Sequence, residues 1–289
     1  MHINNTLGGD YMQAGVSSAC LYPEILEDSI ESLAKLGIKN MELFVNSDCE
    51  LTTTYITEVK HILDFYGSSC RSIHPFTAPI EPMLFFSAYE RRVQDGIEYY
   101  KKYFNAMNIL GAKILVLHGN KSIVPVEESL YFDRFYRLYS AGKQFGVTVA
   151  QENVARCQCN NIPFIQHMIQ QLGKDANFVI DLKQAIRSNL DVFEVFDTVK
   201  DNLAHVHISD SNQYKDCLPL GKGTFDIPKL IDTLKSYSFN GYIMVELYRN
   251  NFKSVKDLNE SYIYLSDTIK HSYERWYVLW NVSFVVAMT

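Results

Sequence analysis

The chain has 289 residues, of which 47% are hydrophobic, enough for one large domain with a substantial core. The formal net charge is −6, and Lys and Arg form no dense cluster, which argues against a nucleic-acid-binding surface. The six cysteines include no C-x-x-C pair, a pattern typical of reduced thiols in a cytosol-like compartment. No basic region followed by an apolar one opens the chain, so we expect a cytoplasmic protein.

Strand-like apolar runs alternate with helical patterns along the chain. The strand-like runs lie at residues 11–18, 40–45, 69–76, 113–120, 147–154, 177–182, 203–209 and 241–248. The helical patterns that follow them lie at residues 23–37, 54–66, 89–110, 127–145, 161–172, 191–199, 227–237 and 254–274. Eight such pairs predict an α/β protein with a single closed (β/α)8 TIM barrel. The alternative, a doubly wound open sheet, is disfavoured because no G-x-G-x-x-G motif follows a strand.

The barrel is expected to span residues 11–274, after an N-terminal tail at 1–10 and before an apolar segment at 275–289. That last segment is too short and too interrupted for a membrane span. We therefore expect this segment to pack on the barrel exterior or on a second subunit. A homo-oligomer is thus possible, and we expect no association with a membrane.

Seven of the eight predicted strands end their apolar run with a carboxylate or an imidazole. These residues are Glu42, His74, His118, Glu152, Asp181, His207 and Glu246. Barrel strands end around one mouth, where the active sites of this architecture lie. Carboxylate oxygens and imidazole nitrogens bind divalent cations, so the set predicts a metal site. A ligand role and a substrate contact explain His74 and His118 equally well, and a rim salt bridge would also explain Glu42.

The stretch LAHVHISDSN places two histidines on the same face of one strand, since strand side chains alternate. His205 lies two residues deeper than His207. We therefore expect His205 to be a hydrogen-bonded core residue and His207 to reach the barrel mouth.

Five motifs, in this order and spacing, resemble the xylose-isomerase-like barrel superfamily: VAQENVAR, FVIDLKQA, HVHISDSN, PLGKGTFDIPKLIDTL and GYIMVELY. This superfamily contains sugar and sugar-phosphate isomerases and epimerases, inosose dehydratases and metal-dependent apurinic endonucleases. The resemblance implies that one divalent cation (Mn²⁺, Mg²⁺ or Zn²⁺) is bound by Glu152, Asp181, His207 and Glu246. It also implies that Glu152 and Glu246 exchange a proton with the substrate, as in the ketose 3-epimerases.

The polar lining departs from that of the ketose 3-epimerases. Gln184 stands where they have a histidine, Gln158 where they carry another acid, and Gln213 where they have an arginine. The residues expected to contact the substrate are His74, His118, Glu42, Gln184, Arg156 and Lys222.

We predict a divalent-metal-dependent sugar or sugar-phosphate isomerase or epimerase that acts on a small polyhydroxylated carbonyl compound. An inosose-type dehydratase, a phosphodiesterase of the apurinic-endonuclease type and a non-catalytic sugar-binding barrel are the alternatives. The endonuclease is disfavoured because the loop YKDCLPLGKG contains no histidine for a third metal, and because the chain lacks a basic stripe for DNA.

Overall fold

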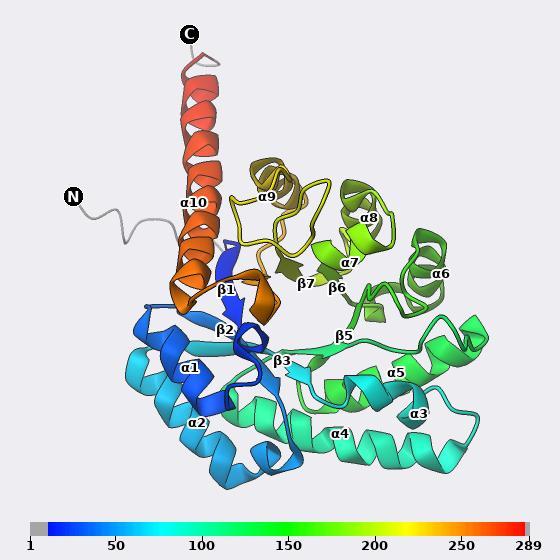
Figure 1. The fold of residues 1–289 in the computed structure, drawn as a ribbon. Helices are drawn as coiled ribbons and strands as arrows, with labels where there is room; N and C mark the ends of the chain where they lie inside the picture. The colour runs from blue at the N-terminus through cyan, green and yellow to red at the C-terminus, as the bar shows by residue number, and fades with distance from the viewer. Residues whose placement is uncertain (1–10, 287–289) are drawn as a thin grey trace.

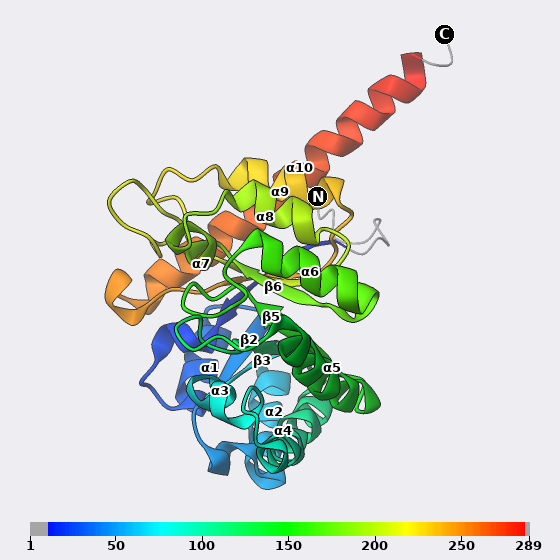
Figure 2. The same cartoon turned by 90° about the vertical axis from the view of Figure 1, so that its right-hand side faces the viewer.

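The computed structural model describes residues 11–286, with side chains as far as Arg275. Eight parallel strands form one closed barrel in sequence order, and the helices surround it (Figures 1 and 2), as predicted. The strands are β1 (Gln13–Ser17), β2 (Asn40–Val45), β3 (Ser69–Pro75), β4 (Ile114–Leu117), β5 (Thr148–Glu152), β6 (Phe178–Asp181), β7 (Leu203–Ile208) and β8 (Tyr242–Val245). The longer helices are α1 (Leu26–Lys35), α2 (Thr53–Tyr66), α4 (Glu90–Leu110), α5 (Glu128–Gln144), α6 (Ile162–Leu172), α8 (Val192–Val199), α9 (Ile227–Ser236) and α10 (Val255–Val286).

Short helices that the sequence did not predict lie between these elements. They are α3 (Glu81–Leu84), α7 (Leu182–Arg187), η1 (Ser18–Leu21), η2 (Asp48–Leu51), η3 (Ala78–Ile80), η4 (Gly173–Asp175) and η5 (Arg249–Asn251). The first long helix also begins later than expected, at Leu26 rather than Pro23. Pro23 lies in a turn that a hydrogen bond from Glu24 N to the Leu21 carbonyl closes at 2.9 Å.

The barrel interior is apolar in its middle and polar at its mouth, where the carboxyl ends of the strands lie. Three buried residues on adjacent strands form a small apolar cluster separate from the main core: Val116, Ala150 and Val179. Two positions further along each chain segment come His118, Glu152 and Asp181, which face the same way because strand side chains alternate. The carboxyl ends of these strands therefore carry the polar groups.

The apolar segment predicted at 275–289 continues α10 as far as Val286. In Figures 1 and 2 the C-terminal part of α10 extends away from the barrel. The side chains beyond Arg275, the residues 287–289 and the predicted tail at 1–10 lie outside the described part of the chain. Within the described part, no helix combines the length and the apolar character that a membrane crossing needs.

Candidate active site

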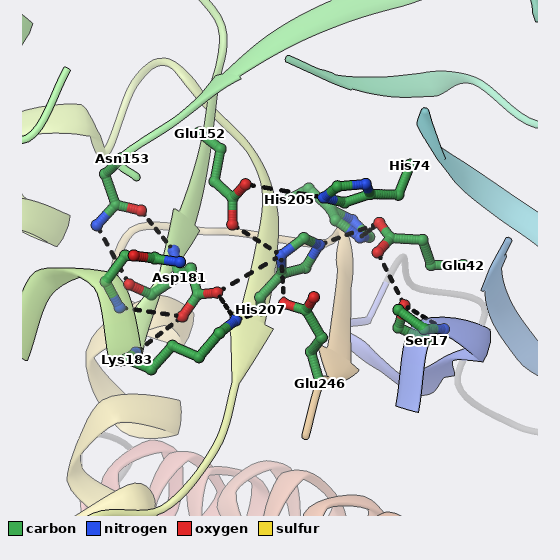
Figure 3. Close-up of polar contacts among 12 residues, drawn as sticks. Ser17, Glu42, His74, Glu152, Asn153, Asp181, Lys183, His205, His207 and Glu246 are labelled. Atoms are coloured by element: carbon green, nitrogen blue, oxygen red, sulfur yellow. Dashed lines mark hydrogen bonds and ion pairs between the residues drawn. The ribbon is translucent and has the colours of Figure 1, made fainter. Parts of the chain in front are cut away.

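Side chains from four successive strands meet around one ring nitrogen of His207 (Figure 3). His207 Nδ1 lies 3.3 Å from Glu152 Oε1, 3.1 Å from Glu246 Oε2 and 3.9 Å from Asp181 Oδ2. One ligand atom from each of these residues lies within 4.8 Å of the others. The strand register explains the meeting, because Asp181 pairs with His207 across β6 and β7. We call Glu152, Asp181, His207 and Glu246 the four-residue cluster.

The other ring nitrogen of His207 points at a buried carboxylate. Glu42 Oε2 lies 3.0 Å from His207 Nε2 and 3.4 Å from His205 Nε2. Ser17 and Ser72, which are paired with Glu42 across β1 and β3, donate hydroxyl hydrogen bonds to it at 3.1 and 2.8 Å. Glu42 is fully buried and lies behind His207. His205 is also fully buried and lies 3.1 Å from Ser72 Oγ, which confirms its prediction as a hydrogen-bonded core residue.

A second group of possible metal-ligand residues, His74, His118 and Glu152, shares Glu152 with the four-residue cluster. His118 Nε2 lies 2.9 Å from Glu152 Oε2 and 2.9 Å from His74 Nε2. Glu152 Oε2 is buried and accepts no well-aligned hydrogen bond, although His118 is so close. His74 Nδ1 is likewise buried without a partner. Two imidazoles and a carboxylate oxygen thus converge here, as they do around cations.

The charges in the cluster shift one another's protonation. Burial raises the pKa of Glu152, but the neighbouring His118 and His207 together outweigh burial and hold that pKa well below its usual range. Burial also raises the pKa of Glu246, and Lys183 and His207 reverse this and lower it. For His207, burial lowers the pKa, whereas Glu42 and Glu246 raise it well above its usual value. Both glutamates are therefore carboxylates at neutral pH.

Asp181 and Lys183 join the end of β6 to the start of α7. Asp181 Oδ1 caps the helix by accepting hydrogen bonds from Lys183 N at 2.8 Å and Gln184 N at 3.3 Å. The Lys183 side chain folds back so that its Nζ contacts Asp181 Oδ2 and lies 2.7 Å from Glu246 Oε2 (Figure 3). This lysine was not predicted to belong to the site. The sequence offered only its place two residues after Asp181 in the motif FVIDLKQA as a signal.

The other predicted substrate contacts lie in segments that follow the strands: Gln184 in α7, and Arg156 and Lys222 in loops. Gln184 Oε1 accepts a hydrogen bond from Ala155 N at 3.1 Å and so links the loops that follow β5 and β6. Arg156 is exposed in the loop after β5. Lys222 is exposed after β7 and lines a cavity of about 320 Å³ together with Lys253 and Asp257.

Asp210 organises the loop that carries Lys222. The Asp210 carboxylate is buried and accepts backbone hydrogen bonds from Gly221 at 3.0 Å, Gly223 at 2.9 Å and Phe225 at 3.2 Å. Glycine suits this loop, since a Cβ at position 223 would meet the Ser211 carbonyl oxygen and the Asp210 carboxylate. An aspartate at a strand end followed by a glycine-rich loop is the sequence signal for such an arrangement.

Comparison with known proteins finds similar chains over most of the length of this one. The family model described as a xylose isomerase-like TIM barrel matches residues 30–267. The 3-dehydro-D-guloside 4-epimerase of Escherichia coli (strain K12) is 20% identical over 263 residues, which cover 81% of this chain and 92% of that protein. The structure of a D-tagatose 3-epimerase-like protein matches with a TM-score of 0.76 at 19% identity, covering 91% of this chain and 99% of that one. A probable 3-DHS dehydratase from Bacillus anthracis matches with a TM-score of 0.71 at 12% identity, covering 88% of this chain and 98% of that one.

Proposed function

The chain belongs to the xylose isomerase-like TIM barrel family, and we propose that it is a divalent-metal-dependent sugar epimerase or isomerase. It would move a proton at a carbon beside a carbonyl group of a small polyhydroxylated compound, free or phosphorylated. The observation that carries this proposal is the convergence of three carboxylates on one ring nitrogen of His207 at the barrel mouth.

The donor set fits a divalent cation. Glu152, Asp181, His207 and Glu246 offer three carboxylates and one imidazole within 4.8 Å of one another. Oxygen and imidazole ligands of this kind suit Mn²⁺, Mg²⁺ or Zn²⁺. When bound, such a cation polarises a carbonyl oxygen and makes the adjacent C–H group more acidic. Glu42 would support the set from behind by fixing the orientation of the His207 ring, as carboxylates do for metal-binding histidines.

Two glutamates on different sides of the mouth are suited to the proton transfers. Glu152 ends β5 and Glu246 follows β8, so they approach a substrate from well-separated strands of the barrel. Both are ionised at neutral pH, which an acceptor of a carbon-bound proton requires. One would remove the proton as a carboxylate, and the other, after taking up a proton from solvent, would deliver it to the opposite face of the carbon. Proton exchange with solvent would then return both glutamates to their starting states.

The substrate class follows from this chemistry. The relative from Escherichia coli is named for epimerisation at carbon 4 of a 3-dehydro sugar, where the reacting carbon adjoins an oxidised one. We propose the same relationship between the reacting carbon and a keto group for the substrate of this chain. The proposed substrate contacts are His74 and His118 at the mouth, Gln184 in α7, and Arg156 and Lys222 in the loops.

Hydrogen exchange with solvent tests the proposal. Incubation of the Mn²⁺-loaded protein with D-tagatose, a 3-dehydro-D-guloside and related keto sugars in heavy water should introduce deuterium beside the carbonyl, as measured by NMR. Glu152→Gln and Glu246→Gln should each abolish the exchange and keep the fold, as checked by circular dichroism. Glu58→Gln, which changes an exposed glutamate of α2, serves as the matched control.

Exchange that survives both substitutions would contradict the assignment of the two glutamates. Loss of water from the substrate without epimer formation would instead identify a dehydratase. Absence of both reactions for every sugar would leave a sugar-binding barrel as the better interpretation.

A further inference from the structure

A lysine ammonium group lies among the carboxylates of the four-residue cluster. Only 3% of Lys183 is exposed, and its Nζ contacts Asp181 Oδ2 and lies 2.7 Å from Glu246 Oε2. Lysine is almost never buried to this degree without a partner of opposite charge. The proposed proton transfers use Glu152 and Glu246 and do not involve this ammonium group.

The ammonium group occupies the side of the cluster where a metal ligand shell would form. Asp181 Oδ2 and Glu246 Oε2 are the carboxylate atoms that face His207 Nδ1, at 3.9 and 3.1 Å. They are the same two atoms that Lys183 Nζ contacts. A divalent cation bound beside His207 Nδ1 through these two oxygens would lie close to the ammonium group that already contacts them, and the two cations would repel each other strongly.

Helix stability does not explain this position. Lys183 is the second residue of α7, and its side chain turns back toward the positive end of that helix. The ammonium group is instead held in place by its two ion pairs, with Asp181 and Glu246.

We propose that the Lys183 ammonium group occupies this site in the metal-free protein, where it forms ion pairs with both Asp181 and Glu246. It must release both carboxylates before a divalent cation binds. This inference rests on the proposed function, because it concerns the same four ligands. Lys183 thereby weakens the metal affinity of the site and stabilises the metal-free protein. The Tyr248 ring, whose centroid lies 5.7 Å from Nζ, offers the displaced ammonium group a nearby aromatic surface.

The test compares Lys183→Met with the wild-type chain. Methionine keeps the length of the side chain and removes its charge. Lys256→Met is the matched control, since the Lys256 side chain is 80% exposed on α10. After metal removal with a chelator, Mn²⁺ affinity is measured by calorimetry, and the thermal midpoint is measured with and without Mn²⁺.

Lys183→Met should bind Mn²⁺ at least about tenfold more tightly than wild type, since removing a buried like charge beside the ion favours binding. Its metal-free thermal midpoint should be lower, and its gain in midpoint on adding Mn²⁺ should be larger. Lys256→Met should match wild type in all three measurements. Lys183→Gln, which retains hydrogen-bonding capacity, takes the place of the methionine variant if the latter does not fold without metal.

The outcomes separate this inference from the proposed function. Equal or weaker Mn²⁺ binding by the folded variant, with binding retained by wild type, overturns the inference alone. Binding by the variant but not by wild type supports the inference and overturns metal dependence of the native protein. Binding by neither overturns both. A metal-loaded crystal structure in which Lys183 Nζ still contacts both carboxylates would also overturn the inference.

Discussion

Glu42→Gln should weaken divalent-cation binding by roughly ten- to a hundredfold, because the carboxylate behind His207 orients the ring and favours its electron donation. Glu42 is fully buried, and its Oε2 lies 3.0 Å from His207 Nε2. Glutamine keeps the shape of the side chain but removes the negative charge. Only its carbonyl oxygen can still accept a hydrogen bond, so it cannot serve Ser17, Ser72 and His207 as the carboxylate does.

The expected magnitude follows from the hydrogen bond that is lost. A hydrogen bond to a charged group contributes roughly 1.5–3 kcal/mol. Since each 1.4 kcal/mol changes an equilibrium constant about tenfold, this range corresponds to roughly ten- to a hundredfold in affinity. Loss of a carboxylate that supports a metal-binding histidine costs about the same in other proteins.

Titration of the chelator-treated protein with Mn²⁺ in a calorimeter measures the effect. Ser17→Ala is the control, because it removes a hydroxyl donor 3.1 Å from Glu42 Oε1 and leaves the carboxylate charge in place. That control should change the Mn²⁺ affinity less than Glu42→Gln does, because it removes one donor to Glu42 Oε1 and leaves the contact of Glu42 Oε2 with His207 Nε2 in place. Wild-type affinity in a Glu42→Gln protein that unfolds cooperatively would refute the reasoning.

Two further predictions concern stability. Burial raises the pKa of Glu81 from 4.5 to about 7, so the folded protein retains a proton that the unfolded chain has lost, and stability should fall as the pH rises between these values. Glu81→Gln should remove this contribution of roughly 3 kcal/mol, as measured by urea denaturation at pH 5 and pH 8, and an unchanged pH dependence would contradict it. Asp210→Ala should lower the free energy of unfolding by roughly 2–4 kcal/mol, because it removes a buried acceptor of three backbone hydrogen bonds in the loop. It should also speed tryptic cleavage after Lys222, and an unchanged cleavage rate would contradict the role of Asp210 in holding that loop.

The barrel could be predicted because its signal is repeated in every unit. Each strand is a short, mostly apolar run, as buried parallel strands require, and in seven of the eight predicted strands a carboxylate or imidazole was expected at the end of that run. The register then follows from closure of the barrel, and it brings residues such as Asp181 and His207 into adjacent positions. For these reasons the convergence of strand-end residues could be expected before any side chain was placed.

The contacts of the individual side chains could not be predicted in the same way. Glu42 was expected at the mouth, and only the pairing of β2 with β1 and β3 places it between Ser17 and Ser72, behind His207. The direction of a long side chain such as that of Lys183 depends on rotamers and on charges brought in by other strands. Neither the periodicity nor the spacing of the sequence contains that information.

A balance of charge explains why a lysine suits this site. Glu152, Asp181 and Glu246 bring three carboxylates into the buried end of the barrel, where each unpaired charge costs several kcal/mol. Burial raises the pKa of Asp181 to about 7, so Asp181 is the last of the three to ionise; once all three are ionised, Lys183 offsets one charge and leaves two, which matches one divalent cation. If the ammonium group moves only as far as the Tyr248 ring, it stays in the site. The three carboxylates, the lysine and the divalent cation then have a total charge of zero. The same three carboxylates without a lysine would keep one negative charge after the cation binds, so they would bind the cation more tightly and oppose negative charge on the substrate more strongly.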